Sequence, residues 1–222
     1  MDFPDRAALL VIDMQKSALP GRPYEVPGLA PAADRIAALA AACRHQGIPV
    51  IYTRHVYRSD GGDAPRGEPV DSAGRPLGYR ADSDDALIMD EVRPAPSEPV
   101  IDKTRWSAFF ATGLDLILRR GKVDDLILCG IVTDGCVLAS ALDGFSLGYR
   151  IHLVKDACAA ATPAVHAAAV LLMANNIHGL CIYRADELLA ALDGNPHRCW
   201  EWREPGGLPF GADNLMELYE KL

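Results

Sequence analysis

AALLVID, at residues 7–13, is the stretch that decides the fold, because six apolar residues in succession end on an aspartate. A continuous apolar run of this length is typical of a strand that is buried on both faces, as in a parallel sheet. Similar runs follow at residues 48–53 (IPVIYT), 125–131 (DLILCGI) and 150–154 (RIHLV). Stretches with helical spacing separate these runs, so strands and helices alternate along the chain.

The remaining segments complete an alternating pattern. Residues 99–102 predict a short third strand and residues 177–183 a sixth. Helices are predicted at 29–46, 113–120, 134–147, 162–176 and 185–192. Strands that alternate with helices imply right-handed crossovers and a sheet covered on both faces. We therefore predict an α/β fold: a three-layer α/β/α sandwich around a six-stranded, mostly parallel, Rossmann-like sheet.

The chain divides into one domain and a tail. Residues 1–192 hold the alternating pattern, whereas 193–222 begin with Pro, Gly and Trp and end in an amphipathic segment at 214–222. We expect this tail to pack on the domain or on a neighbouring subunit. The stretch from Tyr57 to Gly78 is rich in Gly, Pro, Asp and Arg and predicts a long loop, of the kind that is usually functional or mobile.

Composition excludes several functions. The 222 residues are 50% hydrophobic and 23% charged, which is ordinary for a globular protein. A net charge of -8 disfavours nucleic acid or an anionic membrane as a partner. No apolar stretch is long enough to span a bilayer, and the N-terminus lacks the pattern of a secretory signal. Six cysteines without zinc spacing predict free thiols in a reducing cytoplasm.

Three reactive side chains stand at predicted strand ends, where open α/β sheets place their sites. Asp13 ends the first strand, Lys103 follows the third, and Cys136 opens the helix after the fourth. Each has an ordinary structural explanation: a cap, a surface charge and a small buried thiol. A helix N-terminus, however, favours a thiolate. Together the three supply a nucleophile, a base and a cation, so we predict a catalytic triad.

The same motifs resemble those of the isochorismatase-like hydrolases. The resemblance spans about residues 7–192 and includes Asp156 after the fifth strand. It is carried by LVIDMQ (10–15), IDK (101–103) with SAF (107–109), and CGIVTDGCV (129–137). It implies a cis peptide between Ile131 and Val132, and an oxyanion hole formed by the N–H groups of Val132 and Cys136. It implies no cofactor and a homodimer or homotetramer.

The resemblance, together with a cysteine at position 136, implies amidase chemistry on a small molecule. Asp13 would accept the thiol proton, Lys103 would stabilise the thiolate, and Cys136 would attack the carbonyl of an amide or ureido group. The alternative is an isochorismatase-type hydrolase that cleaves a vinyl ether with Asp13 as the acid and leaves Cys136 idle. A binding protein that kept the fold is a rival from another class, and a dinucleotide enzyme lacks the GxGxxG motif.

The sequence also indicates which residues around the triad contact the substrate. Nicotinamidases of this class carry an Asp-x-His metal site after the second strand, but His55 stands where the aspartate would be, so no metal is expected. Residues 56–58 (VYR) resemble the loop of N-carbamoylsarcosine amidases, so Arg58 could bind a substrate carboxylate. The arginine that those amidases use for the carboxylate, after the fifth strand, is replaced here by Ala161. The candidate contacts, each with a structural alternative, are Gln15, His55, Arg58, Trp106, Phe109 and Thr133, with Phe110 as a further aromatic wall.

Overall fold

A computed structural model describes residues 6–222 and contains one seven-stranded sheet. Its strands run in the order β3-β2-β1-β4-β5-β6-β7, and only β7 is antiparallel to its neighbour. The strands are β1 (Ala7–Ile12), β2 (Val50–His55), β3 (Val100–Lys103), β4 (Asp125–Ile131), β5 (Arg150–Ala159), β6 (Cys181–Tyr183) and β7 (Trp200–Glu201). The α/β class is confirmed; the predicted count of six strands is wrong by one, because the tail supplies β7.

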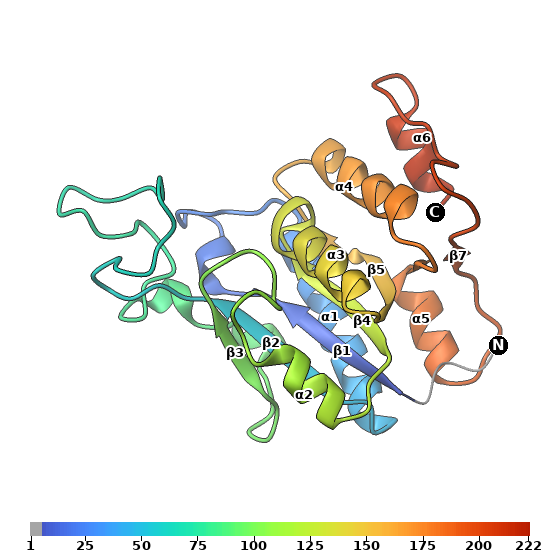
Figure 1. Cartoon of the computed structure of the whole chain (residues 1–222), viewed down its shortest axis with the longest axis horizontal. Helices are drawn as coiled ribbons and strands as arrows, with labels where there is room; N and C mark the ends of the chain where they lie inside the picture. The colour runs from blue at the N-terminus through green and yellow to red at the C-terminus, as the bar shows by residue number, and fades with distance from the viewer. Residues whose placement is uncertain (1–5) are drawn as a thin grey trace.

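Helices cover both faces of the sheet (Figure 1). Helices α1 and α5 contribute to one apolar core, and α2, α3 and α4 contribute to the other. The helices are α1 (Leu29–His45), α2 (Leu114–Arg120), α3 (Leu138–Ser146), α4 (Pro163–Asn176), α5 (Ala185–Leu192) and α6 (Leu215–Glu220). Thr162 caps α4, as its position before Pro163 predicts: its side chain accepts a hydrogen bond from Val165 N.

The apolar run of β1 serves both cores. Ala7, Leu9 and Val11 belong to the core beneath α1 and α5, and the alternating residues Ala8, Leu10 and Ile12 belong to the opposite core. Successive side chains of a strand point to opposite faces, so a strand between two helical layers must be apolar at every position. This burial explains why AALLVI is continuous rather than alternating.

The junction of β1 and β4 requires glycine at position 130. Gly130 pairs with Ile12 and has a φ of +119°. A Cβ there would lie 2.1 Å from the carbonyl oxygen of Ile12. Only glycine allows this close approach, and the approach brings the end of β4 against the end of β1.

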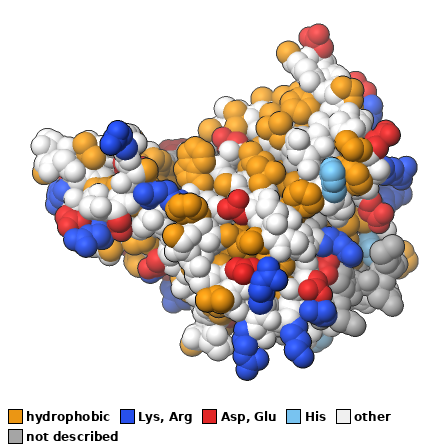
Figure 2. Space-filling model, viewed as in Figure 1, with side chains coloured by type: hydrophobic (Ala, Val, Ile, Leu, Met, Phe, Trp, Pro, Cys, Tyr) orange, Lys and Arg blue, Asp and Glu red, His pale blue; other side chains and the backbone are white. Residues whose placement is uncertain are grey.

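Two segments extend beyond the central layers. The connection between β2 and β3 projects from the edge of the sheet (Figure 1) and includes the short 3₁₀ turns η2 (Asp84–Ala86) and η3 (Asp90–Val92). Lys/Arg and Asp/Glu side chains intermingle on this projection (Figure 2). The tail packs on the domain itself, through the pairing of β7 with β6 and the contact of α6 with α4. Among residues 6–222, no helix is long and apolar enough to span a membrane.

Candidate active site

Four buried polar side chains stand at the carboxyl ends of four neighbouring strands. In sheet order they are Lys103 at the end of β3, His55 at the end of β2, Asp13 after β1 and Cys136 after β4. Their exposed fractions are 2%, 6%, 5% and 8%. The parallel sheet thus brings together the predicted triad of Asp13, Lys103 and Cys136, which are far apart in sequence, and adds His55.

The ammonium group of Lys103 lies at the centre of this cluster. Its Nζ is 2.5 Å from Asp13 Oδ2 and 3.3 Å from Cys136 Sγ. It is also 3.5 Å from His55 Nδ1 and donates a hydrogen bond to the Arg105 carbonyl at 3.0 Å. Burial lowers the pKa of Lys103, but the nearby Asp13 and Cys136 raise it by more, so its pKa is raised overall and the side chain is a cation.

Thr53 positions the Asp13 carboxylate. The Thr53 hydroxyl donates to Asp13 Oδ1 at 2.6 Å and accepts from the Asp13 backbone N–H at 3.2 Å. Asp13 has a φ of 51°, a left-handed conformation that is uncommon for a residue other than glycine and is often found at functional sites. One oxygen is therefore held by Thr53, and the other faces Lys103. Thr53 was not among the predicted site residues, although it ends the run at 48–53 that predicted the second strand.

Cys136 lies in η4 (Thr133–Val137), a single π-helical turn that follows β4 and leads into α3. The peptide bond between Ile131 and Val132 is cis, as the resemblance implied. The Val132 carbonyl accepts from Gly135 N and Val137 N, which closes the turn. Burial and the Asp13 carboxylate raise the pKa of the Cys136 thiol, and Lys103 offsets this rise only in part. The thiol is therefore protonated in the resting protein at neutral pH.

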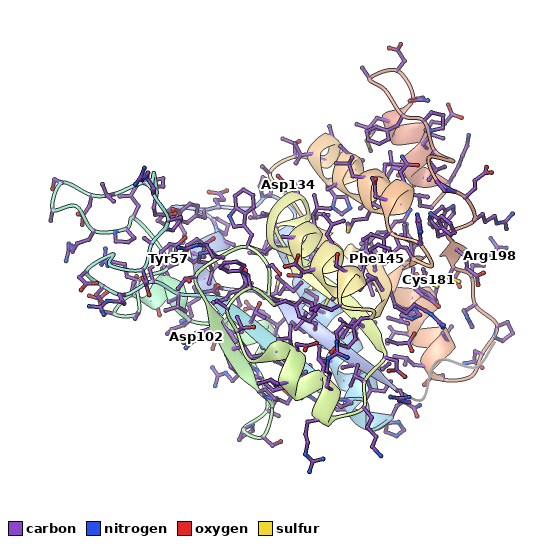
Figure 3. The ribbon with its side chains drawn as sticks, in the orientation of Figure 1. Tyr57, Asp102, Asp134, Phe145, Cys181 and Arg198 are labelled. Carbon is purple, nitrogen blue, oxygen red and sulfur yellow. The ribbon has the colours of Figure 1, made fainter. Side chains whose placement is uncertain are left out.

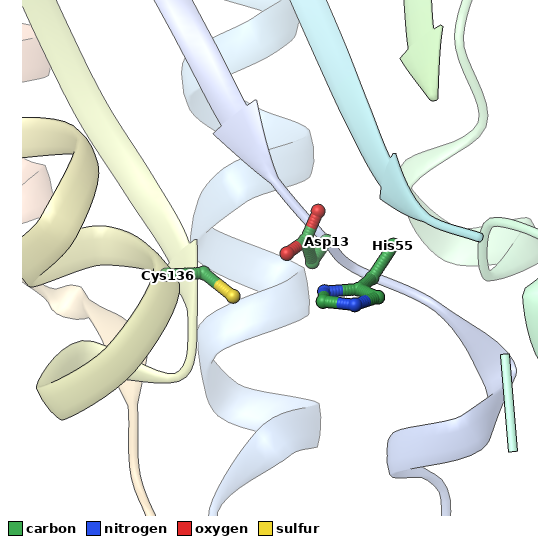
Figure 4. Close-up of side chains that lie close together, drawn as sticks. All are labelled: Asp13, His55 and Cys136. Carbon is green, nitrogen blue, oxygen red and sulfur yellow. The ribbon is translucent and has the colours of Figure 1, made fainter. Parts of the chain in front are cut away.

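His55 completes the cluster as a neutral imidazole. Burial, followed by the charge of Lys103, lowers its pKa from 6.5 to about 4. In Figure 4 the side chains of Asp13 and His55 lie next to each other, and the Cys136 side chain points toward them. The fully buried Gln15 anchors the His55 backbone: its amide oxygen accepts from His55 N, and its amide nitrogen donates to His55 O and to Ala86 O. Gln15 therefore ties the end of β2 to η2 through its side-chain amide.

Donor atoms of Asp13, His55 and Cys136 lie within 4.8 Å of one another, a spacing that also suits a metal ion. The Lys103 ammonium, however, contacts each of these side chains. The cation that this cluster holds is therefore the lysine.

A pocket of about 500 Å³ opens beside the cluster. His55 belongs to both, since it lines the pocket and contacts Lys103. Other lining residues are Tyr57, Arg66, Glu68, Arg105, Trp106 and Phe110. Trp106 and Phe110 are 65% and 59% exposed, so they form aromatic walls at the open side.

Three other predicted contacts lie elsewhere. Arg58 is bound to Asp60 at the exposed surface and does not line the pocket. Phe109 packs against one core and stacks on Tyr149. Thr133 is fully buried, and its hydroxyl lies 2.7 Å from His166 Nδ1. The common reason is that each of these side chains already has a partner within the protein.

Comparisons with known proteins show what this chain is similar to. The family model of the isochorismatase domain matches residues 7–181. A maleamate amidohydrolase of Pseudomonas putida is 36% identical over 162 residues, 69% of this chain and 72% of that enzyme. An N-carbamoylsarcosine amidase of an Arthrobacter species is 33% identical over 172 residues, 73% of this chain and 63% of that amidase. The crystal structure of an isochorismatase family protein from Desulfovibrio vulgaris superposes with a TM-score of 0.78 at 34% identity, covering 85% of this chain and 98% of the other.

Proposed function

Because this chain belongs to the isochorismatase family, we propose that it is a cysteine-dependent hydrolase that cleaves a C–N bond of a small amide or ureido compound. Two relatives at 33% identity or more carry names that denote hydrolysis of such bonds. The observation that carries the proposal is the placement of the Lys103 ammonium between the Asp13 carboxylate and the Cys136 thiol. A nucleophile, a base and a cation in mutual contact are what acyl transfer through a thioester requires.

The resting thiol determines the order of proton transfers. Since the pKa of Cys136 is raised, its proton must leave as the sulfur attacks, and the Asp13 carboxylate accepts it. Lys103 is then close enough to stabilise the developing thiolate. The C–S bond forms as the carbonyl π electrons move to oxygen. The backbone N–H groups of Val132 and Cys136 are the proposed donors to that oxyanion.

Collapse of the tetrahedral intermediate breaks the C–N bond. Asp13 returns its proton to the leaving nitrogen, which departs as ammonia or an amine and leaves an acyl group on Cys136. Water then attacks this thioester, with Asp13 as the general base, and releases the acid and the free thiol. Each proton taken up by Asp13 is returned in the same half-reaction, so no external acid, base or cofactor is needed.

Ammonia release tests this proposal. Purified protein and its Cys136→Ala variant are assayed with a panel of small amides and ureido acids. We expect turnover by the wild type and a loss of roughly 10⁴-fold or more in kcat for the variant. Cys181→Ala is the matched control, because Cys181 lies on β6, away from Tyr57 and the pocket (Figure 3). Turnover by Cys136→Ala equal to that of the wild type would rule out Cys136 as the nucleophile.

A further inference from the structure

A groove of about 1430 Å³ lies between the tail and the domain. Its lining residues come from β5, β6, α4 and α5 on one side and from the tail on the other. Arg198 at this groove and Tyr57 at the active-site pocket lie at opposite sides of the molecule (Figure 3). The family model ends at residue 181, so the tail side of the groove lies outside the matched domain.

The domain side of the groove contains a buried cation, Lys155. Only 2% of Lys155 is exposed, and no carboxylate of residues 6–222 forms an ion pair with it. Its Nζ donates to the Tyr219 carbonyl at 2.9 Å and lies 4.3 Å from the centre of the Tyr219 ring. These contacts hold the ammonium group without neutralising its charge. A buried cation without a carboxylate partner favours an anionic ligand.

The acidic groups near Lys155 compensate its charge only in part. Burial lowers the pKa of Lys155, and the charge of Glu220 offsets this effect incompletely, so the pKa is lowered overall. Glu220 itself is exposed on α6. Asp156 also raises the pKa of Lys155, but it is already paired with Arg35 and Arg184. Lys155 therefore remains short of negative charge, which a bound anion would supply.

The tail adds two further cations to the groove. Arg198 and Arg203 line it, both are exposed, and neither forms an ion pair in the described part of the chain. Three carboxylates line the groove as well, but none of them pairs with these arginines or with Lys155: Glu187, Glu201 and Glu204. The two arginines are therefore available to an anion that also pairs with Lys155.

Tyr219 connects the groove to the turn that carries Cys136. Its carbonyl and ring contact Lys155, and its hydroxyl lies 3.0 Å from His166 Nε2. The other ring nitrogen of His166 lies 2.7 Å from the Thr133 hydroxyl in η4. An anion that fixes Lys155 and the tail would thus act on η4 through Tyr219 and His166.

We propose that the groove between the tail and the domain is a second, regulatory site for a small anion that carries a carboxylate or a phosphate group. The anion bridges Lys155 on β5 with an arginine of the tail. This bridge favours the packed position of α6 and so holds η4 in place. Such a site does not depend on the hydrolase activity proposed above, because anion binding can be measured without turnover.

Tryptophan fluorescence measures anion binding at the groove. Trp200 lines the groove and Trp106 lines the active-site pocket, so Trp106→Phe protein is titrated with inorganic phosphate or succinate at constant ionic strength. We expect a saturable change, with the dissociation constant raised roughly 10-fold or more by Lys155→Met and a few-fold by Arg203→Gln. Arg120→Gln is the matched control, because Arg120 is an exposed arginine of α2 that does not line the groove.

Saturation by either anion supports the site, and the tighter of the two shows which group the site prefers. Because Arg203 is exposed, its replacement separates loss of the anion site from loss of the fold. Absence of saturation with both anions, or binding that Lys155→Met leaves unchanged, would overturn the proposal.

The alkylation rate of Cys136 tests the connection to η4. Iodoacetamide is added with and without the anion that binds, and the rate is followed by peptide mass. We expect the bound anion to slow alkylation a few-fold, because a turn that is held in place opens less often. Tyr219→Phe should remove this effect without removing anion binding. An unchanged rate at saturating anion, or slowing that persists in Lys155→Met, would contradict the regulatory role.

Discussion

The Lys103 ammonium provides the charge balance of the site, because it neutralises a carboxylate that is 95% buried. Removing one member of a buried ion pair leaves the other charge unpaired in a medium of low dielectric constant. The ion pair between Lys103 and Asp13 can therefore be tested by the stability of variants that lack one partner, as well as by their activity.

We predict that Lys103→Met lowers the free energy of unfolding by about 3–5 kcal/mol, because it leaves the Asp13 carboxylate without its cation. Adding Asp13→Asn to Lys103→Met should recover part of this loss. Urea denaturation of the two single variants and the double variant measures the coupling. Purely additive losses would show that the two side chains do not depend on each other.

The lowered pKa of His55 predicts that the stability of the fold depends on pH. Its pKa is about 4 in the folded protein against 6.5 for the free side chain, so the unfolded chain binds a proton at a higher pH than the folded protein does. The contribution of neutral His55 is therefore complete above pH 6.5 and is lost as the pH falls from 6.5 toward 4, by about 3 kcal/mol in total.

The variant His55→Asn should remove this loss. Thermal or urea denaturation at several values between pH 7 and pH 4 is expected to give a shallower decline for the variant than for the wild type. Parallel curves for the two proteins would mean that His55 titrates normally in the folded state.

At the scale of elements, the tail is connected to the turn that carries Cys136. Thr133 in η4 lies 2.7 Å from His166 Nδ1 on α4, and His166 Nε2 lies 3.0 Å from the hydroxyl of Tyr219 on α6. The buried Lys155 donates to the Tyr219 carbonyl and lies 4.3 Å from the centre of its ring. Helix α6 therefore helps to hold η4 through one histidine.

We predict that Tyr219→Phe lowers kcat by a few-fold with little change in KM, and costs about 1 kcal/mol of stability, because it removes one hydrogen bond but keeps the ring over Lys155. The control is Tyr149→Phe, which removes a tyrosine hydroxyl bound to Asp115 instead. Equal effects of the two variants on kcat would argue against a positioning role for Tyr219.

Hydrophobic periodicity predicted the helices and strands in which burial determines which positions are apolar. β1 is apolar at every position because helices cover both of its faces, and α4 carries its own start signal in Thr162 and Pro163. β7 could not be predicted, since its two residues gain their conformation by pairing with β6. The π turn around Cys136 was expected to be the first turn of one helix, because local sequence does not distinguish a π turn from an α turn.

At the scale of the whole molecule, the triad was predictable and the pocket was not. Strand ends of a parallel sheet converge, so Asp13, Lys103 and Cys136 could be placed together from their positions in the pattern. Which loop arginine faces the pocket depends on ion pairs formed across the long connection, such as Arg54 with Asp102. Composition gives no sign of these pairs, so the sequence predicted Arg58 at the pocket, whereas Arg66 and Arg105 line it.

Large exposed aromatic groups at the pocket mouth lead to a prediction about assembly. Trp106 and Phe110 are mostly exposed, and side chains of this kind are enriched at protein interfaces. We expect a homodimer or homotetramer, measured by light scattering as a mass of at least twice 23.9 kDa. Trp106→Ser should shift the equilibrium toward smaller species. A monomer at high micromolar concentration would contradict this expectation.

The acyl group on Cys136 is the central claim, and mass spectrometry tests it most directly. The wild-type protein is mixed with a substrate found by the ammonia assay, quenched with acid within the first turnover, and digested. We predict that the peptide bearing Cys136 gains the mass of the acyl part of the substrate, and that the other five cysteines remain unmodified. Turnover without any such adduct, together with an active Cys136→Ala variant, would contradict the account.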